Sequence, residues 1–174
     1  MATETNLILP VPAAEPVVGE HRMRYDPTAA QRVPAHITVL APFLIREVMT
    51  VEDVDGLRAL FAAVAPFEFT LATVADFPGV LYLAPEPAQP FIELTEAVWR
   101  RWPYHPPYGG AYEEIVPHLT VAVGDSSWSE LRRELLRRLP ISGTAHEVWW
   151  IARQRGEGWR CVERFALRGA SRTR

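Results

Sequence analysis

The sequence PAHITVL at residues 34–40 returns, as a loose echo, in VPHLTVA at residues 116–122. Each copy has a histidine and a threonine two residues apart, in an aliphatic run that follows a proline. Successive side chains of a strand point to opposite faces, so we expect His36 and Thr38 to share one face of a strand, and His118 and Thr120 one face of another. Each strand would carry an imidazole beside a hydroxyl and bury aliphatic side chains on its reverse.

The elements expected around the two copies follow the same order. Apolar residues at helical spacing predict helices over 16–25, 54–64 and 91–102. A fourth helix is predicted to begin after a cap within Ser126–Ser129 and to reach Leu139. Alternating or apolar runs predict strands over 6–11, 67–74, 80–83, 145–152 and 159–167. Each half then runs from a helix to a His-x-Thr strand, a helix and a hairpin. This order favours an α+β fold with antiparallel or mixed sheets.

Two local signals refine this reading. Thr50 stands three residues before Asp53, a capping-box pattern at the start of the second helix. A passage with prolines at 85, 87 and 90 is the candidate boundary between the halves. A chain of 174 residues suits one domain, or two small lobes that share a core.

Composition limits the classes of partner and compartment. A formal net charge of -3 argues against an extended nucleic-acid surface and favours a small phosphate ester as ligand. Cys161 is the single cysteine, which excludes an intramolecular disulfide and cysteine-based metal sites. The N-terminus lacks the pattern of a signal peptide, and no apolar run approaches the roughly 18 residues of a membrane span. We therefore expect a cytoplasmic protein, and a monomer.

The paired histidines have rival explanations. A histidine in a strand is more often a structural residue than a catalyst, but Val or Ile would serve a buried face better in both copies. Neither motif has a third metal ligand at a characteristic spacing, and the HExxH, Gly-x-Ser-x-Gly, Walker and Rossmann patterns are absent. The other three histidines lack a threonine two residues later. We expect His21 on a helix surface, His105 in a loop and His146 near the start of a strand.

The two motifs, written HITVLAPF and HLTVAVG, resemble those of the 2H phosphoesterase superfamily, in particular its branch of 2′-5′ RNA ligases and RNA 2′,3′-cyclic phosphodiesterases. The resemblance implies two pseudo-symmetric lobes, each an antiparallel sheet with helices packed outside, around a central groove. In this chain the lobes would span about 1–86 and 87–174 of a single bilobal domain, and strands can be exchanged between them.

The resemblance also implies roles for residues. His36 and His118 become the catalytic acid and base, in an order that the sequence leaves open, and Thr38 and Thr120 hold the phosphate. No metal or cofactor is expected. Base stacking would come from Phe43, Tyr82 or an aromatic residue of the 102–112 loop, and a phosphate or sugar contact from Arg153. For these last residues a core or surface role stays open.

The function expected from the resemblance is a metal-independent phosphodiesterase acting on 2′,3′-cyclic or related phosphates of nucleotides or RNA ends. Imidazole suits this chemistry, because its pKa near 6.5 allows it to take or give a proton near neutral pH. The activity can include 2′-5′ RNA ligation. The alternatives are a non-catalytic module that binds a nucleotide or an RNA end, and hydrolysis of another phosphoester or a thioester-like ligand.

Overall fold

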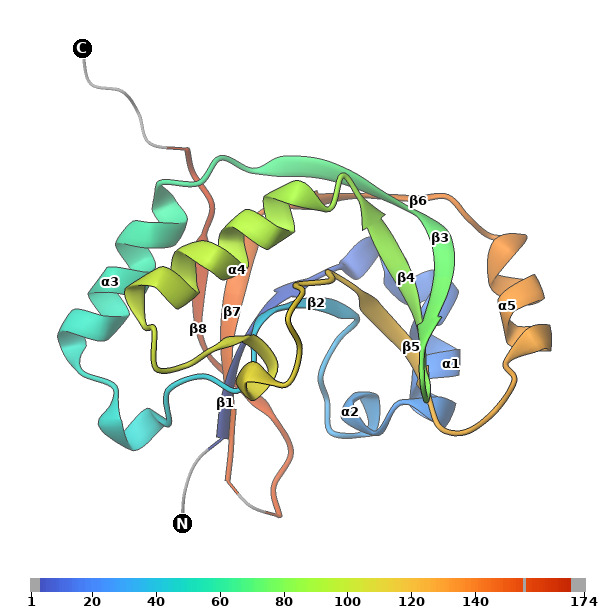
Figure 1. The fold of residues 1–174 in the computed structure, drawn as a ribbon, viewed down its shortest axis with the longest axis horizontal. Coiled ribbons are helices and arrows are strands. Elements are labelled where there is room, and N and C mark those ends of the chain that lie inside the picture. Colours follow the sequence, from blue (N-terminus) through green and yellow to red (C-terminus); the bar gives the residue numbers. More distant parts are fainter. Residues whose placement is uncertain (1–3, 155, 170–174) are drawn as a thin grey trace.

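The strands of this protein form two four-stranded antiparallel sheets in a computed structural model that describes residues 4–154 and 156–169 (Figure 1). Sheet A has the order β2 (His36–Leu40), β1 (Glu4–Pro10), β7 (Glu147–Arg153), β8 (Arg160–Ala166). Sheet B has the order β5 (Leu119–Val123), β4 (Val80–Glu86), β3 (Phe67–Phe77), β6 (Ile141–Ala145). The predicted α+β class with antiparallel sheets is confirmed.

Both sheets draw strands from both halves of the chain. Sheet A combines β1 and β2 with β7 and β8, and sheet B combines β3 and β4 with β5 and β6. The proline-rich passage from the end of β4 to the start of α4 therefore divides the chain into halves, but each sheet contains strands from both sides of that passage. In each sheet the His-x-Thr strand is an edge strand beside a partner that precedes it in the chain, β1 for β2 and β4 for β5. Because of this shared arrangement, each residue of β2 can be compared with the residue at the same place in β5.

The helices lie outside the sheets (Figure 1). They are α1 (Glu15–Tyr25), α2 (Pro27–Ala30), α3 (Val51–Ala62), α4 (Gln89–Arg101) and α5 (Ser129–Leu136), with short 3-10 turns η1 (Pro12–Ala14), η2 (Arg46–Val48) and η3 (Pro107–Gly110). The capping box before α3 is confirmed, because Thr50 Oγ1 accepts from the Asp53 N–H at 3.1 Å and Asp53 Oδ2 accepts from the Thr50 N–H at 3.0 Å.

Two connecting helices cross between the sheets. Helix α1 joins β1 to β2 but packs against β5, whereas α4 joins β4 to β5 but packs against β2. Thr95 on α4 donates a hydrogen bond to the Val39 carbonyl of β2 at 2.7 Å. Each motif strand is thus supported by a helix from the other half, and this exchange ties the two motif strands into one core.

Two predicted elements need correction. The strand expected over 145–152 is β7, which begins at Glu147, and it is preceded by an unpredicted strand, β6, that ends at Ala145 and belongs to the other sheet. The sequence of β6 gave little strand signal because it contains Gly143, where a Cβ would lie 2.7 Å from the Phe69 ring. Helix α5 ends at Leu136 rather than Leu139, and its N-cap is Trp128 at φ 50°, without a side-chain cap. In the described residues no helix is long and apolar enough to cross a bilayer.

Candidate active site

The first motif lies on β2 with its two polar side chains on one face. Ile37 and Val39 are 1% and 3% exposed and face the core, where α4 packs. His36 and Thr38 alternate with them and are half-buried. The expected separation of polar and aliphatic faces is therefore present in this strand.

The second motif repeats this pattern at β5. Leu119 and Val121 are fully buried, and Thr120 is half-buried opposite Tyr82 of β4. His118 directly precedes the strand rather than lying in it. Within the ±1 residue by which strand ends are defined, this agrees with the expected position.

Both imidazoles are held by the same hydrogen bond. His36 Nδ1 lies 2.8 Å from the Pro34 carbonyl oxygen, and His118 Nδ1 lies 2.7 Å from that of Val116. A carbonyl oxygen only accepts, so each Nδ1 carries the proton that is donated, and each neutral ring keeps its lone pair on Nε2. Each motif therefore presents an Nε2 that can take a proton, or give one when the ring is charged.

The structure brings the two motif strands together. Residues of β2 and β5 approach within 8 Å between Cα atoms, although the strands belong to different sheets. The His118 imidazole is also close enough for its charge to lower the pKa of His36. The four predicted side chains on these two strands thus belong to one region of the molecule.

Burial sets the protonation of both rings. It lowers the pKa of His36 from 6.5 to about 4, although the bond to the Pro34 carbonyl opposes this shift. The Arg22 charge lowers this pKa further, and the Asp26 charge raises it. Burial also lowers the pKa of His118, against the effect of the Val116 carbonyl. Both rings are therefore mostly neutral at pH 7 in the ligand-free protein.

A buried ion pair lies behind the first motif, and the sequence reading missed it. Arg22 and Asp26 are 2% and 4% exposed, and Arg22 Nη2 lies 2.9 Å from Asp26 Oδ2. Arg22 also donates to the Val33 carbonyl and to Thr28 Oγ1, both at 3.2 Å. The network holds the segment that leads into β2 and so places Pro34 beside the ring of His36. The sequence does contain a signal for this pair, because residues four apart on a helix, such as Arg22 and Asp26, lie on the same face and can form an ion pair.

Aromatic rings surround the second motif instead. Tyr82 stacks on Phe77 with ring centres 4.5 Å apart, and both rings meet His118 edge-on, at 5.4 Å and 5.2 Å. Tyr108, in the predicted aromatic loop, lies nearly parallel to His118 at 6.0 Å, and burial raises its pKa to about 12. The prediction for Tyr82 named a residue that does lie in the site region, whereas Phe77 was not anticipated.

The rings of Phe77, Tyr108 and His118 border a cavity of about 690 Å³, which Tyr82 does not line. Its lining includes Phe77, Tyr108, Tyr112 and His118, with the carboxylates of Glu113 and Glu114. The volume falls within the range of small-molecule sites, which are mostly apolar with few polar groups. The cavity can therefore receive a flat apolar group whose polar end reaches His118.

Two residues predicted as substrate contacts lie elsewhere. Phe43 is 3% exposed and packs in the core, edge-on to Trp102 at 5.5 Å, so its ring has no free face for stacking. Arg153 bonds Glu4 at 2.7 Å and Gln31 at 2.6 Å, and lies over the Trp159 ring. Its Nε and Nη1 already bond residues of the protein, and neither Phe43 nor Arg153 enters the site proposed below.

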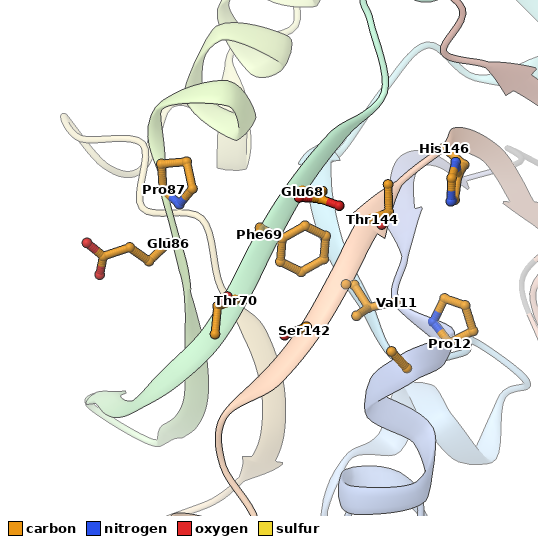
Figure 2. A pocket seen from close by; sticks show the side chains of 12 residues that line it. Val11, Pro12, Glu68, Phe69, Thr70, Glu86, Pro87, Ser142, Thr144 and His146 are labelled. Atoms are coloured by element: carbon orange, nitrogen blue, oxygen red, sulfur yellow. The ribbon is translucent and has the colours of Figure 1, made fainter.

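A second cavity, of about 610 Å³, lies where β3 and β6 face the end of β1 and η1 (Figure 2). Its polar lining comes from Glu68, Thr70, Glu86, Ser142, Thr144 and His146. None of the four motif side chains lines it. Across residues 4–154 and 156–169, no group of three or more His, Cys, Asp or Glu residues is placed to hold a metal ion.

Comparison with known proteins gives concordant results. The model of the 2′-5′ RNA ligase superfamily matches residues 9–157. The "Putative phosphoesterase" of Bacillus pumilus is 26% identical over 92% of this chain and 95% of its own length. Escherichia coli LigT in its complex with 3′-AMP superposes with a TM-score of 0.66 at 16% identity, covering 96% of this chain and 99% of LigT. A protein of Thermus thermophilus gives a TM-score of 0.56 at 19% identity, covering 97% of this chain and 100% of its own.

Proposed function

The chain belongs to the 2′-5′ RNA ligase superfamily, and we propose that it is a phosphodiesterase that opens the 2′,3′-cyclic phosphate of a nucleotide or an RNA end. The observation that carries this proposal is the matched pair of Nδ1 hydrogen bonds at two motif strands of different sheets that approach each other within 8 Å between Cα atoms. They leave two Nε2 atoms free in one region, as an acid–base pair requires.

The reaction needs one proton acceptor and one proton donor. One neutral imidazole takes a proton from water at Nε2 while the water oxygen forms a bond to phosphorus. The bond from phosphorus to the 2′ or 3′ oxygen breaks, and the other imidazole, in its charged form, donates a proton from Nε2 to that oxygen. The product is a nucleoside monophosphate end, and the imidazoles together supply both proton transfers.

The threonines and the bound phosphate complete this scheme. The hydroxyls of Thr38 and Thr120 donate hydrogen bonds to the non-bridging phosphate oxygens, where negative charge is concentrated. The negative phosphate raises the pKa of a nearby imidazole, which offsets the lowering by burial and allows one ring to carry the proton that the leaving oxygen needs. The base of the nucleotide occupies the aromatic cavity beside His118.

LigT supports the ligand class, because its crystal structures were obtained with 3′-AMP, phosphate, ATP and NADP+, all of which carry phosphate. The same acid and base can also open the cyclic phosphate with a 5′-hydroxyl RNA end in place of water. The 5′ oxygen then bonds to phosphorus, the bond from phosphorus to the 3′ oxygen breaks, and a 2′-5′ bond results. A gel assay with such an end tests ligation separately from hydrolysis.

The decisive assay uses adenosine 2′,3′-cyclic phosphate with EDTA present. We expect the wild type to form AMP, and His36→Ala and His118→Ala to lose nearly all turnover. Equal turnover in the three proteins would contradict the mechanism. Binding without turnover in the wild type would instead indicate a module that holds a nucleotide.

A further inference from the structure

A row of four residues crosses sheet A from the first motif. Thr38 lies opposite Ile8, Ile8 opposite Trp149, and Trp149 opposite Arg164. Residues opposed on neighbouring strands project from the same face, and neighbouring strands are about 4.8 Å apart. The backbone of Trp149 therefore lies about 10 Å from that of Thr38, two strand spacings across, on the face that carries the motif hydroxyl.

The far end of this row is an aromatic ring under a cation. The Arg164 guanidinium lies 4.3 Å from the Trp149 ring centre, and the Arg164 side chain is 59% exposed. Glu147 Oε1 accepts from Trp149 Nε1 at 2.6 Å and lies 3.9 Å from Arg164 Nη1. The Glu147 carboxylate thus holds the indole of Trp149 by a hydrogen bond and attracts the Arg164 guanidinium. The guanidinium remains exposed to solvent.

A second pair of the same kind lies beside it. Arg153 lies over the Trp159 ring at 4.9 Å, and both tryptophans pack on the small buried cluster of Ile8, Val33 and Ile151. Trp159 donates its backbone N–H to the Gln31 carbonyl at 3.1 Å, which anchors that part of the β7–β8 hairpin. Trp149 therefore sits on a firm base, and the flexible member of its pair is the exposed Arg164.

We propose that Trp149 and Arg164 form a subsite for the nucleotide that precedes the cyclic phosphate in an RNA strand. This inference rests on the proposed function, in which the terminal base occupies the cavity beside His118. Bases stack on aromatic rings and on guanidinium planes, and a guanidinium also attracts the linking phosphodiester. A mononucleotide would leave this end of the row unused. The net charge of -3 and the nearby carboxylate of Glu147 limit the contact to a short stretch of strand.

The test compares adenosine 2′,3′-cyclic phosphate with the RNA trinucleotide ApApA that ends in a 2′,3′-cyclic phosphate. We expect the wild type to show a kcat/KM about tenfold higher for the trinucleotide, which corresponds to one stacked base. Trp149→Ala and Arg164→Gln should bring the ratio of the two kcat/KM values toward one. Arg164→Gln is the safer variant because its side chain is exposed. Arg101→Gln removes an arginine that lies over Trp102 on α4, away from this row, and should keep the wild-type ratio.

Two results would overturn the subsite: a wild-type ratio of one, or an Arg164→Gln ratio equal to that of the wild type. If neither substrate is turned over, the proposed function fails but the subsite is still decided by binding. The tryptophan fluorescence of the protein is then titrated with ApApA carrying a 3′-phosphate and with 3′-AMP. Tighter trinucleotide binding that Arg164→Gln abolishes supports the subsite, and equal affinities refute it.

Discussion

The surroundings of His36 and His118 differ although the two rings are held alike. Each Nδ1 donates to the carbonyl two residues earlier, at 2.8 Å and 2.7 Å. Behind His36, however, lies the buried pair of Arg22 and Asp26, whereas His118 is enclosed by aromatic rings and opens on a cavity. The two motifs therefore hold their imidazoles in the same way, but the surroundings differ: a buried ion pair lies behind His36, and an aromatic-lined cavity lies beside His118.

The largest effect should be the same on both sides of this comparison. Loss of a general acid or base costs about 10²–10⁴-fold in rate. We expect His36→Ala and His118→Ala each to lower kcat by about this much, and the double variant to be little worse than either, because groups that act as a unit are not additive. His146→Ala, in the second cavity, is the control. Fully additive losses in the double variant would show that the rings act independently.

The next effect should appear on the His36 side alone. Arg22→Met leaves the Asp26 carboxylate buried without its partner, and breaking a buried pair in this way costs about 3–5 kcal/mol. The free energy of unfolding, measured in urea, should fall by this amount. Arg24→Met, an exposed neighbour on α1, should change it little. A similar small change in both variants would mean that the buried pair does not stabilise the fold.

A smaller effect should appear on the His118 side. Tyr108→Ala removes the ring that lies parallel to His118, and a stacked base is worth about 1–3 kcal/mol. The KM for adenosine 2′,3′-cyclic phosphate should rise about tenfold, with a smaller change in kcat. Tyr104→Ala is a matched control, since that ring is 92% exposed and belongs to the same connection between α4 and β5. An unchanged KM in Tyr108→Ala would show that the base does not bind in this cavity.

The smallest effect concerns pH. The profile of kcat/KM should be bell-shaped, because below about pH 4 both rings are protonated and no base remains, and above the lowered pKa of His118 both are neutral and no acid remains. The optimum should therefore lie on the acid side of 6.5. Arg22→Met removes a charge that lowers the pKa of His36, so its acid limb should move to higher pH. The Asp26 charge, which remains in this variant, raises the pKa of His36. An acid limb that moves to lower pH in Arg22→Met would contradict the assigned effect of Arg22.

Periodicity and the duplicated motif predicted the α+β class, the helices around each motif, the capping box at Thr50 and the polar face of each motif strand. These features depend on neighbouring residues, which the sequence shows directly. The position of β6, the ion pair of Arg22 and Asp26 and the core location of Phe43 depend on contacts between distant segments. Gly143, for example, favours no strand by itself and is explained only by the Phe69 ring that it accommodates. Tyr82 was named as a possible stacking residue beside the family resemblance and stays a prediction, whereas Phe77 was missed because it ends β3 in an expected turn.

The central claim is that the Nε2 atoms of both rings meet one phosphate. Nitrogen-15 NMR of the protein with labelled histidines, titrated with 3′-AMP, tests it most directly. We predict that the Nε2 signals of His36 and His118 shift together and saturate at the same 3′-AMP concentration, while both Nδ1 atoms stay protonated and His21, His105 and His146 change little. A shift of only one of the two rings, or two different saturation points, would contradict the claim.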